Sequence, residues 1–480
     1  MVTELFTILV KSFSIYSLGF VLANFRKTPI KKEINFGLEH SLVGLLALIF
    51  ISWSSYLIFN NALLNIQYYF YIFLTIVLLI RFKNFILKQY LQLFVIVSIL
   101  FFIVNFFELN TSTNDSIAYF YTEGLNFKNK QFSLLIDFRS IPLIIISGYF
   151  DITNINYVAI IPGLVNTLGL LSINSYLKKN NFFLQNDIFS KMFRFILLFT
   201  PVLIFHLFYL NVHFLFGILL TFILFQHYLS EEFDHILYFL ALSIFLILRL
   251  ESLMIFLISS FFLSKKQLVK NTIVLKQVIF SNIFMFLTWF EIFSNESTNT
   301  RGIGQVPESL YTIIIYHSIF FVCYYLFIYK LNNETIYLIL QGLFVLGVSF
   351  MLLITNEIQT ILGMLSPSGI WSIVPIYFIF YIFYLVKQNT NYYRVLFIPV
   401  IWVFFAFIQT PQLFDGLGYY LTDYIFGFLN ENYGVHNNNV SICRDFTKSS
   451  ACQRTFIQIF IPIYYFSQYD LLTRNKYNTL

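Results

Sequence analysis

The sequence predicts an all-α, polytopic transmembrane protein of about 13 to 15 transmembrane helices. Of its 480 residues, 58% are hydrophobic and only 11% are charged, whereas an ordinary soluble domain is about one quarter charged. The apolar residues form long blocks, such as 90–107 and 335–355, and a helix needs about 20 such residues to cross the hydrocarbon core of a bilayer. These blocks lack the alternation of apolar and polar residues that lipid-facing barrel strands show, so we expect helices.

Lysine and arginine residues flank the apolar blocks and predict their orientation. Basic residues are retained in the cytoplasm, and one path through the membrane places the main basic clusters there. On that path the N-terminus is outside, the C-terminus is cytoplasmic, and the chain is a multi-pass protein of the plasma (inner) membrane. The net charge of +6 therefore reflects topology and does not indicate nucleic-acid binding. The clusters are 26–32, 81–88, 178–194 and 265–276, and sparser basic residues follow at Lys330, Lys387, Arg394, Arg474 and Lys476.

The same path divides the chain into five regions. Residues 1–107 form a four-helix N-terminal transmembrane preface, 108–154 an external loop with interfacial helices, and 155–410 the transmembrane core. Residues 411–456 form a second long external loop, and 457–480 the last helix with a cytoplasmic tail. The expected spans lie near 3–24, 40–60, 66–81, 89–107, 155–177, 193–210, 213–229, 235–249, 252–264, 277–294, 310–329, 335–355, 369–386, 395–410 and 457–472.

Two short apolar segments, 143–150 and 361–371, are expected to be re-entrant or interfacial pieces. Irregular backbone at membrane depth is tolerated only inside protein or beside a wet cavity. The long polar segments 108–154, 295–309 and 411–456 all lie outside on this path, so the polar surface available for chemistry is external. No phosphate-binding loop of the G-x-x-x-x-G-K-[ST] type occurs in the sequence, and direct ATP-driven transport is therefore not expected.

Cysteine and histidine residues give one structural prediction and no metal site. Cys443 and Cys452 lie together in the last external loop, where an oxidising exterior favours a loop-closing disulfide; two free thiols are the alternative. His206, His213 and His227 surround one short hairpin but lack the spacing of metal ligands with carboxylates. We interpret these histidines as interfacial or packing residues.

The first external loop carries the strongest candidate for chemistry. Asp115 follows a spanning helix, and the loop then becomes amphipathic, with the aromatic ring of Tyr119 close in sequence to the charge of Glu123. A carboxylate there sits at the mouth of the membrane, where a lipid-linked substrate presents its head group. The alternative is a solvated helix cap, because Asn114 and Asp115 both suit the first position of a helix.

Three arginines outside the basic clusters are candidate ligands for a phosphate or an anionic sugar. Arg249 lies in a tight outer hairpin, where a charged residue is usually paired or functional; an Arg249–Glu251 pair that closes the turn is the alternative. Arg139 precedes the next membrane segment and suits a phosphate, an anionic sugar or a lipid head group. Arg301 lies in a glycine-flanked external loop that is either a lid or an ordinary linker. Lys11 interrupts the first apolar block, and no role is assigned to it.

These features together resemble the integral-membrane glycosyltransferases of the GT-C class. The resemblance covers residues 108–268 and consists of a carboxylate in the first long external loop, a re-entrant or interfacial piece after it, and a short outer hairpin with an arginine. The chain differs in that four helices precede Asp115 where the class commonly has one, and in that the acid is a single Asp. The preface resembles uncharacterised bacterial membrane proteins of surface-polysaccharide loci. A second resemblance is to bacterial O-antigen polymerases, which also have ten or more helices and functional arginines in external loops.

The resemblance implies transfer of a sugar from a polyprenyl-phosphate or polyprenyl-diphosphate donor to an acceptor glycan, lipid or protein on the external face. It implies Asp115 as the catalytic base, with Arg249 and Arg139 meeting the charge of the lipid phosphate. Glu123, Arg301 and Tyr119 are the further substrate-binding candidates. The expected partners are the bilayer, the polyprenyl-linked sugar and the acceptor. No cofactor is implied with certainty, and a divalent cation stays open.

Three other functions remain open at this point. A surface-polysaccharide polymerase would use similar external arginines, and a transporter or flippase of a lipid-linked oligosaccharide would need charged residues along a central path. A purely structural subunit of a membrane complex is the third alternative. The charged residues of this chain concentrate at helix ends, which favours an enzyme with an external site over a transporter.

Overall fold

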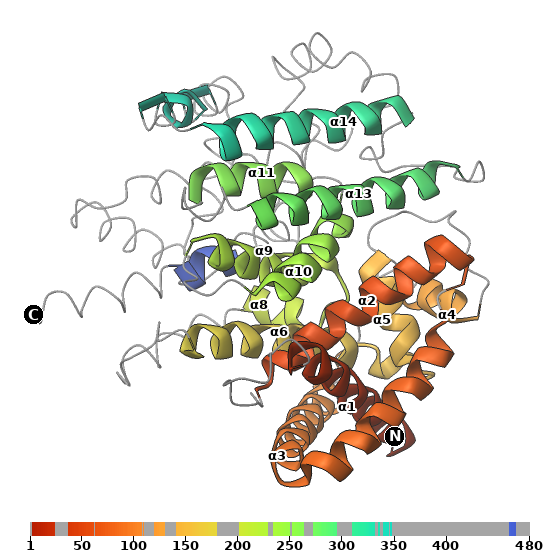
Figure 1. Ribbon diagram of the computed structural model, residues 1–480. Helices are drawn as coiled ribbons and strands as arrows, with labels where there is room; N and C mark the ends of the chain where they lie inside the picture. The colour runs from red at the N-terminus through yellow and green to blue at the C-terminus, as the bar shows by residue number, and fades with distance from the viewer. Residues whose placement is uncertain are drawn as a thin grey trace, which may run out of the picture.

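The computed structural model describes the chain as a bundle of helices (Figure 1). No strand occurs in the described residues, which confirms the all-α prediction for this part of the chain. The described residues are 2–24, 37–61, 63–107, 109, 120–129, 141–179, 201–228, 234–249, 252–263, 272–294, 310–331, 335–336, 339–344, 346–347 and 460–466.

The helices follow the apolar blocks of the sequence. In chain order they are α1 (Val2–Asn24), α2 (Glu39–Phe59), α3 (Leu64–Phe106), α4 (Glu123–Lys128), α5 (Ile141–Phe150), the 3-10 turn η2 (Ile155–Tyr157), α6 (Ile160–Lys179), α8 (Pro201–Phe208), α9 (Val212–Tyr228), α10 (His235–Leu248), α11 (Ser252–Leu263), α13 (Thr272–Ser294), α14 (Leu310–Cys323) and the π-helical turn η3 (Tyr324–Lys330).

Six helical segments within the described residues are long and apolar enough to cross a membrane. Four shorter apolar helices accompany them, namely α5 and the main parts of α9, α10 and α11. The total helix count and the orientation of the two termini stay predictions. The six segments are Val2–Asn24, Glu39–Phe59, Leu64–Lys83, Ile86–Phe106, Ile155–Tyr176 and Thr272–Glu291.

The third and fourth predicted spans are joined by a bend. The sequence predicts separate helices near 66–81 and 89–107, whereas the structure has one helix, α3, whose backbone breaks at Phe82 (φ −128°, ψ 34°). The two arms of α3 diverge from this bend (Figure 1). No loop is needed, because a single residue outside the helical region reverses the direction of the chain.

Both arms of α3 are held by α1. The Ser17 hydroxyl of α1 accepts a hydrogen bond from Thr75 on the first arm (3.0 Å) and is hydrogen-bonded to Tyr90 on the second arm (2.6 Å). Buried hydroxyl groups of this kind satisfy one another inside the apolar bundle, where an unpaired polar group is costly.

A close helix crossing joins α1 to α2 through two glycines. A Cβ added to Gly19 would lie 2.6 Å from the backbone nitrogen of Gly44, and one added to Gly44 would lie 2.9 Å from that of Gly19. Small residues allow this backbone approach, which is how membrane helices gain packing contacts when lipid is as apolar as their side chains.

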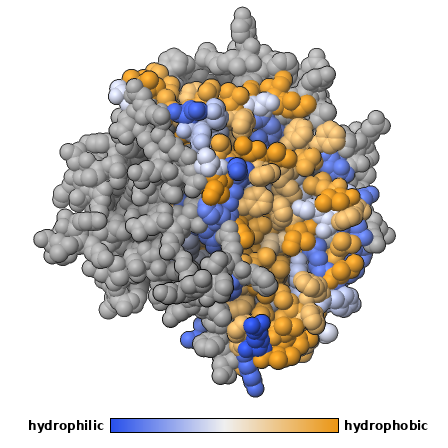
Figure 2. All heavy atoms as spheres, viewed as in Figure 1, coloured by the Kyte–Doolittle hydropathy of each residue, from blue (hydrophilic) through white to orange (hydrophobic). Residues whose placement is uncertain are grey.

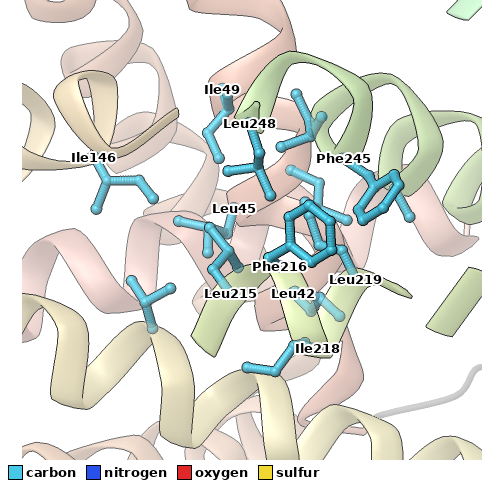
Figure 3. Packing of buried hydrophobic residues seen from close by; sticks show 14 of the residues in the cluster. Leu42, Leu45, Ile49, Ile146, Leu215, Phe216, Ile218, Leu219, Phe245 and Leu248 are labelled. Carbon is cyan, nitrogen blue, oxygen red and sulfur yellow. The ribbon is translucent and has the colours of Figure 1, made fainter. Parts of the chain in front are cut away.

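The apolar core lies where α2, α5, α9 and α10 meet (Figure 3). Leu248 at the end of α10 lies close to Ile49 of α2, and the rings of Phe216 and Phe245 are 4.5 Å apart. The outer surface is also rich in apolar side chains (Figure 2), and Ile80 on α3 is 80% exposed. Such a surface is suited to contact with lipid.

Hydrogen bonds between distant helices define two ends of the bundle. The Glu4 carboxylate at the start of α1 accepts from the backbone N–H of Asn154 (3.2 Å), just before α6. Ser175 near the end of α6 donates to the carboxylate of Glu39 (2.7 Å) at the start of α2. We call these the Glu4 end and the Glu39 end.

The direction of α13 follows from two contacts with α2. The indole N–H of Trp53 donates to the hydroxyl of Thr288 (2.8 Å), and one turn earlier in both helices the ring centroids of Phe50 and Phe284 are 4.7 Å apart. The two helices are therefore parallel. Since α2 runs from the Glu39 end to the Glu4 end, α13 does so too, and Lys276 near its start belongs to the Glu39 end.

Candidate functional site

The turn Phe150–Asn154 at the Glu4 end receives polar contacts from α1, from α4 and from the residues just before α4. It follows α5, whose 10 residues are all buried. At 1.5 Å per residue this helix is about 15 Å long, half the thickness of the hydrocarbon core. It is therefore too short to cross the hydrocarbon core by itself, and the re-entrant or interfacial placement expected for 143–150 stays a prediction.

Lys11 of α1 binds the last backbone carbonyl of α5. Its side chain is 6% exposed, and its ammonium donates to the backbone carbonyl of Phe150 (2.7 Å) while lying 5.4 Å from the ring centroid of Tyr68. The last carbonyls of a helix lack partners inside the helix and carry a partial negative charge, so a buried ammonium stabilises this position. The ammonium also interacts electrostatically with Asp151, Lys128 and Glu4.

The carboxylate of Glu4 binds the chain just after α5. One oxygen accepts from the backbone N–H groups of Thr153 (3.1 Å) and Asn154 (3.2 Å) and from the Thr153 hydroxyl. Asp151, which adopts the left-handed conformation (φ 49°), forms an ion pair with Lys128 at the end of α4. The four charges of Glu4, Lys11, Lys128 and Asp151 sum to zero, so each sign is compensated locally.

Tyr121 holds the same turn from the side of α4. Its hydroxyl donates to the backbone carbonyl of Ile152 (2.6 Å). Burial raises the pKa of this phenol, and the carboxylates of Glu4 and Asp151 raise it further. The hydroxyl thus stays protonated and remains a donor.

Glu123 is the carboxyl group of this region that lacks a full set of partners. It is 2% exposed; one oxygen accepts from the side-chain amide of Asn126 (3.1 Å), and the other has no hydrogen-bond partner among the described residues. Burial raises the pKa of Glu123 above its ordinary 4.5, and the Asn126 hydrogen bond opposes this only in part. A buried carboxyl group with a raised pKa is suited to proton exchange.

Close backbone packing positions Glu123. The next residue, Gly124, crosses Gly148 of α5, and a Cβ on Gly124 would lie 2.7 Å from the Gly148 backbone nitrogen. A Cβ on Gly148 would overlap the carbonyl oxygen of Gly124. The ring of Phe127 also packs 5.5 Å from that of Tyr56 on α2. The short helix α4 is therefore fixed against α5 and α2, although it has only 6 residues.

Arg249 is the other described residue among the sequence candidates. It follows α10 in an extended conformation, is partly exposed, and its carbonyl accepts from the Ser252 N–H (3.2 Å), which closes the turn into α11. Helix α10 packs against α5, as α4 does, so the elements that carry Arg249 and Glu123 share one neighbour. The alternative Arg249–Glu251 pair involves a residue outside the described part of the chain.

The remaining candidates lie outside the described residues and stay predictions. These are Asp115, Tyr119, Arg139 and Arg301, together with the disulfide between Cys443 and Cys452.

Sequence reasoning missed the four charges around the turn. The sequence assigns no role to Lys11 and gives no reason to group it with Glu4, Lys128 and Asp151. Lys11 and Phe150 are 139 positions apart, and Glu4 and Thr153 are 149 apart, so no local pattern connects them. The available signal was a lysine inside an apolar block, which requires a partner at membrane depth.

The histidines behave as packing residues in the described part of the bundle. The rings of His206 and His213 meet edge to face at 6.3 Å, and both residues are buried. The side-chain amide of Asn166 on α6 donates to the Leu207 carbonyl on α8 (3.0 Å) and links these two helices. No group of three or more His, Cys, Asp or Glu side chains placed to hold a metal ion occurs in the described residues.

No protein-family model, no curated protein and no solved structure matches the chain.

Proposed function

We propose that the protein is an integral-membrane glycosyltransferase that uses a polyprenyl-phosphate or polyprenyl-diphosphate sugar at the Glu4 end. The observation that carries the proposal is the Phe150–Asn154 turn with the buried carboxyl of Glu123 beside it. This polar site lies at the end of α5, a buried helix of 10 residues that is too short to cross the hydrocarbon core by itself. A lipid-linked donor can reach such a place laterally, with its chain in the bilayer and its head group at the site.

The distribution of basic residues supports an external position for this end. Arg81 and Lys83 lie at the bend of α3, whose Phe82 ring packs 5.9 Å from Phe20 near the end of α1. Lys178 and Lys179 end α6 on the same side of the bundle. Basic residues are retained in the cytoplasm, so the Glu39 end faces the cytoplasm and the Glu4 end faces outward.

The reaction follows from the chemistry of such a donor. The bond between the anomeric carbon and the donor phosphate breaks, a bond to the acceptor oxygen forms, and the acceptor proton passes to a carboxylate. Asp115 takes that proton, and such a base contributes about 10² to 10⁴ in rate. Arg249 and Arg139 meet the growing charge of the departing lipid phosphate. Glu123 orients the acceptor hydroxyl by a hydrogen bond through its second carboxyl oxygen, which has no partner among the described residues.

Substitutions test the proposal in cells that lack the native gene. Asp115→Asn, Arg249→Ala and Glu123→Gln are compared with Lys330→Gln, an exposed lysine far along the chain, at matched membrane levels of protein. We expect the first three variants to lose surface glycan and to accumulate lipid-linked donor, while Lys330→Gln retains product. Wild-type product levels in all three variants would contradict the proposal.

The identity of the product separates the alternative functions. Loss of a transferase leaves acceptors that lack one sugar, whereas loss of a polymerase leaves single repeat units on the lipid. Loss of a flippase leaves the lipid-linked oligosaccharide in the inner leaflet, where an external glycosidase does not reach it. Each pattern is read by mass spectrometry of the extracted lipids.

A further inference from the structure

The bend of α3 presents three basic side chains without partners. Arg81, Lys83 and Lys88 are all exposed, and within the described residues none of them has an ion pair or a hydrogen bond. The guanidinium of Arg81 lies 5.5 Å from the ring centroid of Phe82, which orients it beside the bend. Three like charges within eight residues attract anions, since no carboxylate of the described part of the chain forms an ion pair with them.

Apolar side chains cover both arms on either side of this bend. Figure 2 shows hydrophilic atoms among apolar ones at the bottom of the view, where Figure 1 places the bend. The charges therefore lie where exposed apolar surface ends, which in a bilayer is the level of the head groups. The exposed apolar residues include Ile76 (51%), Ile80 (80%), Leu87 (45%), Leu91 (63%) and Phe94 (46%).

The surroundings of the bend add positive charge. The Glu39 carboxylate at this end already accepts a hydrogen bond from Ser175. The connector 25–36 joins α1 to α2 at the same end, and its sequence has four basic residues and the single acid Glu33. Within the described residues no carboxylate pairs with the bend, so we look for an acidic partner in the membrane.

We propose that the bend of α3 binds the head groups of anionic phospholipids through Arg81, Lys83 and Lys88. Arg81 offers a bidentate grip on a phosphate, and the two lysines act as point charges near it. A second copy of the chain is a poor occupant, because two bends in contact would bring six unpaired cations together. The site lies at the opposite end of the bundle from the Phe150–Asn154 turn, so the proposal does not depend on the glycosyltransferase assignment.

The test compares two double variants of the full-length protein purified in detergent. Arg81→Gln/Lys83→Gln removes two charges from the bend, and Lys276→Gln/Lys330→Gln removes two from exposed lysines on other helices. The probe is phosphatidylglycerol, with phosphatidylcholine as the neutral control, and bound lipid is counted by native mass spectrometry. A basic residue near an anionic surface contributes about fivefold, or about 1 kcal/mol. We expect phosphatidylglycerol binding to weaken at least tenfold in the bend variant and to change less than twofold in the other.

Two further measurements keep the result interpretable. The charge-conserving variant Arg81→Lys/Lys83→Arg should retain binding, and raising the salt concentration should weaken binding in the wild type. The proposal is overturned if the bend variant binds phosphatidylglycerol as the wild type does, if both double variants lose it equally, or if phosphatidylcholine binds equally well. High-yield disulfide dimers of Lys83→Cys in native membranes would show that a second copy covers the bend, which would also overturn it.

Discussion

The two ends of the bundle differ in whether their charged side chains have partners within the described residues. At the Glu4 end, Lys11, Lys128, Glu4 and Asp151 are bound to one another or to the backbone of one short turn. At the bend of α3, the basic side chains are exposed and have no partner in the described residues. Paired charges therefore mark the turn that ends the buried helix α5, and the exposed charges of the bend lie beside exposed apolar side chains.

The difference has a physical cause. Helix α5 ends inside the protein, so its terminal carbonyls require donors that water does not supply there. The buried ammonium of Lys11 supplies one, and its desolvation is tolerated because the Phe150 carbonyl and two carboxylates surround it. The bend of α3 has no such requirement, since its charged groups are exposed.

The largest effect on stability is expected from a larger side chain where Gly124 and Gly148 cross. Gly148→Leu places side-chain atoms against the Gly124 carbonyl, where backbone must shift, and should destabilise the fold by about 3 kcal/mol or more. Gly347→Ala is the matched control, because no atom lies within 4 Å of its added Cβ. Thermal unfolding of both variants in detergent measures the difference, and equal midpoints would contradict the packing described for α4 and α5.

Replacing each end's lysine by methionine compares the two ends directly. Lys11→Met removes the donor to the Phe150 carbonyl and should cost about 2 kcal/mol, the range of a hydrogen bond to a charged group. Lys88→Met makes the same change on the exposed bend and should stay within about 0.5 kcal/mol of the wild type. Chemical unfolding followed by tryptophan fluorescence gives both values. Equal stability of the two variants would remove the distinction between the ends.

Glu123 predicts a pH dependence at the Glu4 end. Because burial raises its folded-state pKa above the unfolded 4.5, the folded form binds the proton more tightly than the unfolded chain does. The stability contributed by Glu123 is thus fully present below pH 4.5 and is lost as the pH rises through the folded pKa. Glu123→Gln should remove this part of the pH dependence. The melting temperature of the variant should therefore rise relative to that of the wild type as the pH increases. A constant difference between the two proteins across the pH range would contradict the burial of this carboxyl group.

The smallest effect is expected from the ion pair of Lys128 with Asp151. Their side chains are 24% and 28% exposed, so water screens the attraction. A double-mutant cycle with Lys128→Gln and Asp151→Asn should give a coupling of about 0.2 to 1 kcal/mol that falls as salt is added. A coupling above that range that is insensitive to salt would show that the pair is more deeply buried than described.

The apolar pattern was sufficient to predict most described helices. The expected spans 213–229 and 235–249 agree within about one residue with α9 and α10, because hydrophobic blocks bounded by polar residues fix where a membrane helix begins and ends. The bend at Phe82 was not predicted, since a short basic stretch between two apolar blocks does not distinguish a loop from a sharp bend.

Less of the candidate site than of the fold could be predicted from the sequence. Glu123 was selected from its place in an amphipathic loop, but its burial depends on the Gly124–Gly148 crossing, which joins residues 24 positions apart. The partners of Lys11 and Glu4 lie still farther along the chain. Such contacts follow from how the helices pack and not from any local periodicity.

The two ends of the bundle should face opposite sides of the membrane, and cysteine accessibility in intact cells measures this. Lys128→Cys and Lys83→Cys are placed separately in a background in which Cys323, Cys443 and Cys452 are replaced by Ser, and a membrane-impermeant maleimide is added. We expect labelling at position 128 in intact cells and at position 83 only after the membrane is permeabilised. Labelling of position 83 in intact cells, with position 128 protected, would show that the Glu4 end faces the cytoplasm and that the proposed orientation is wrong.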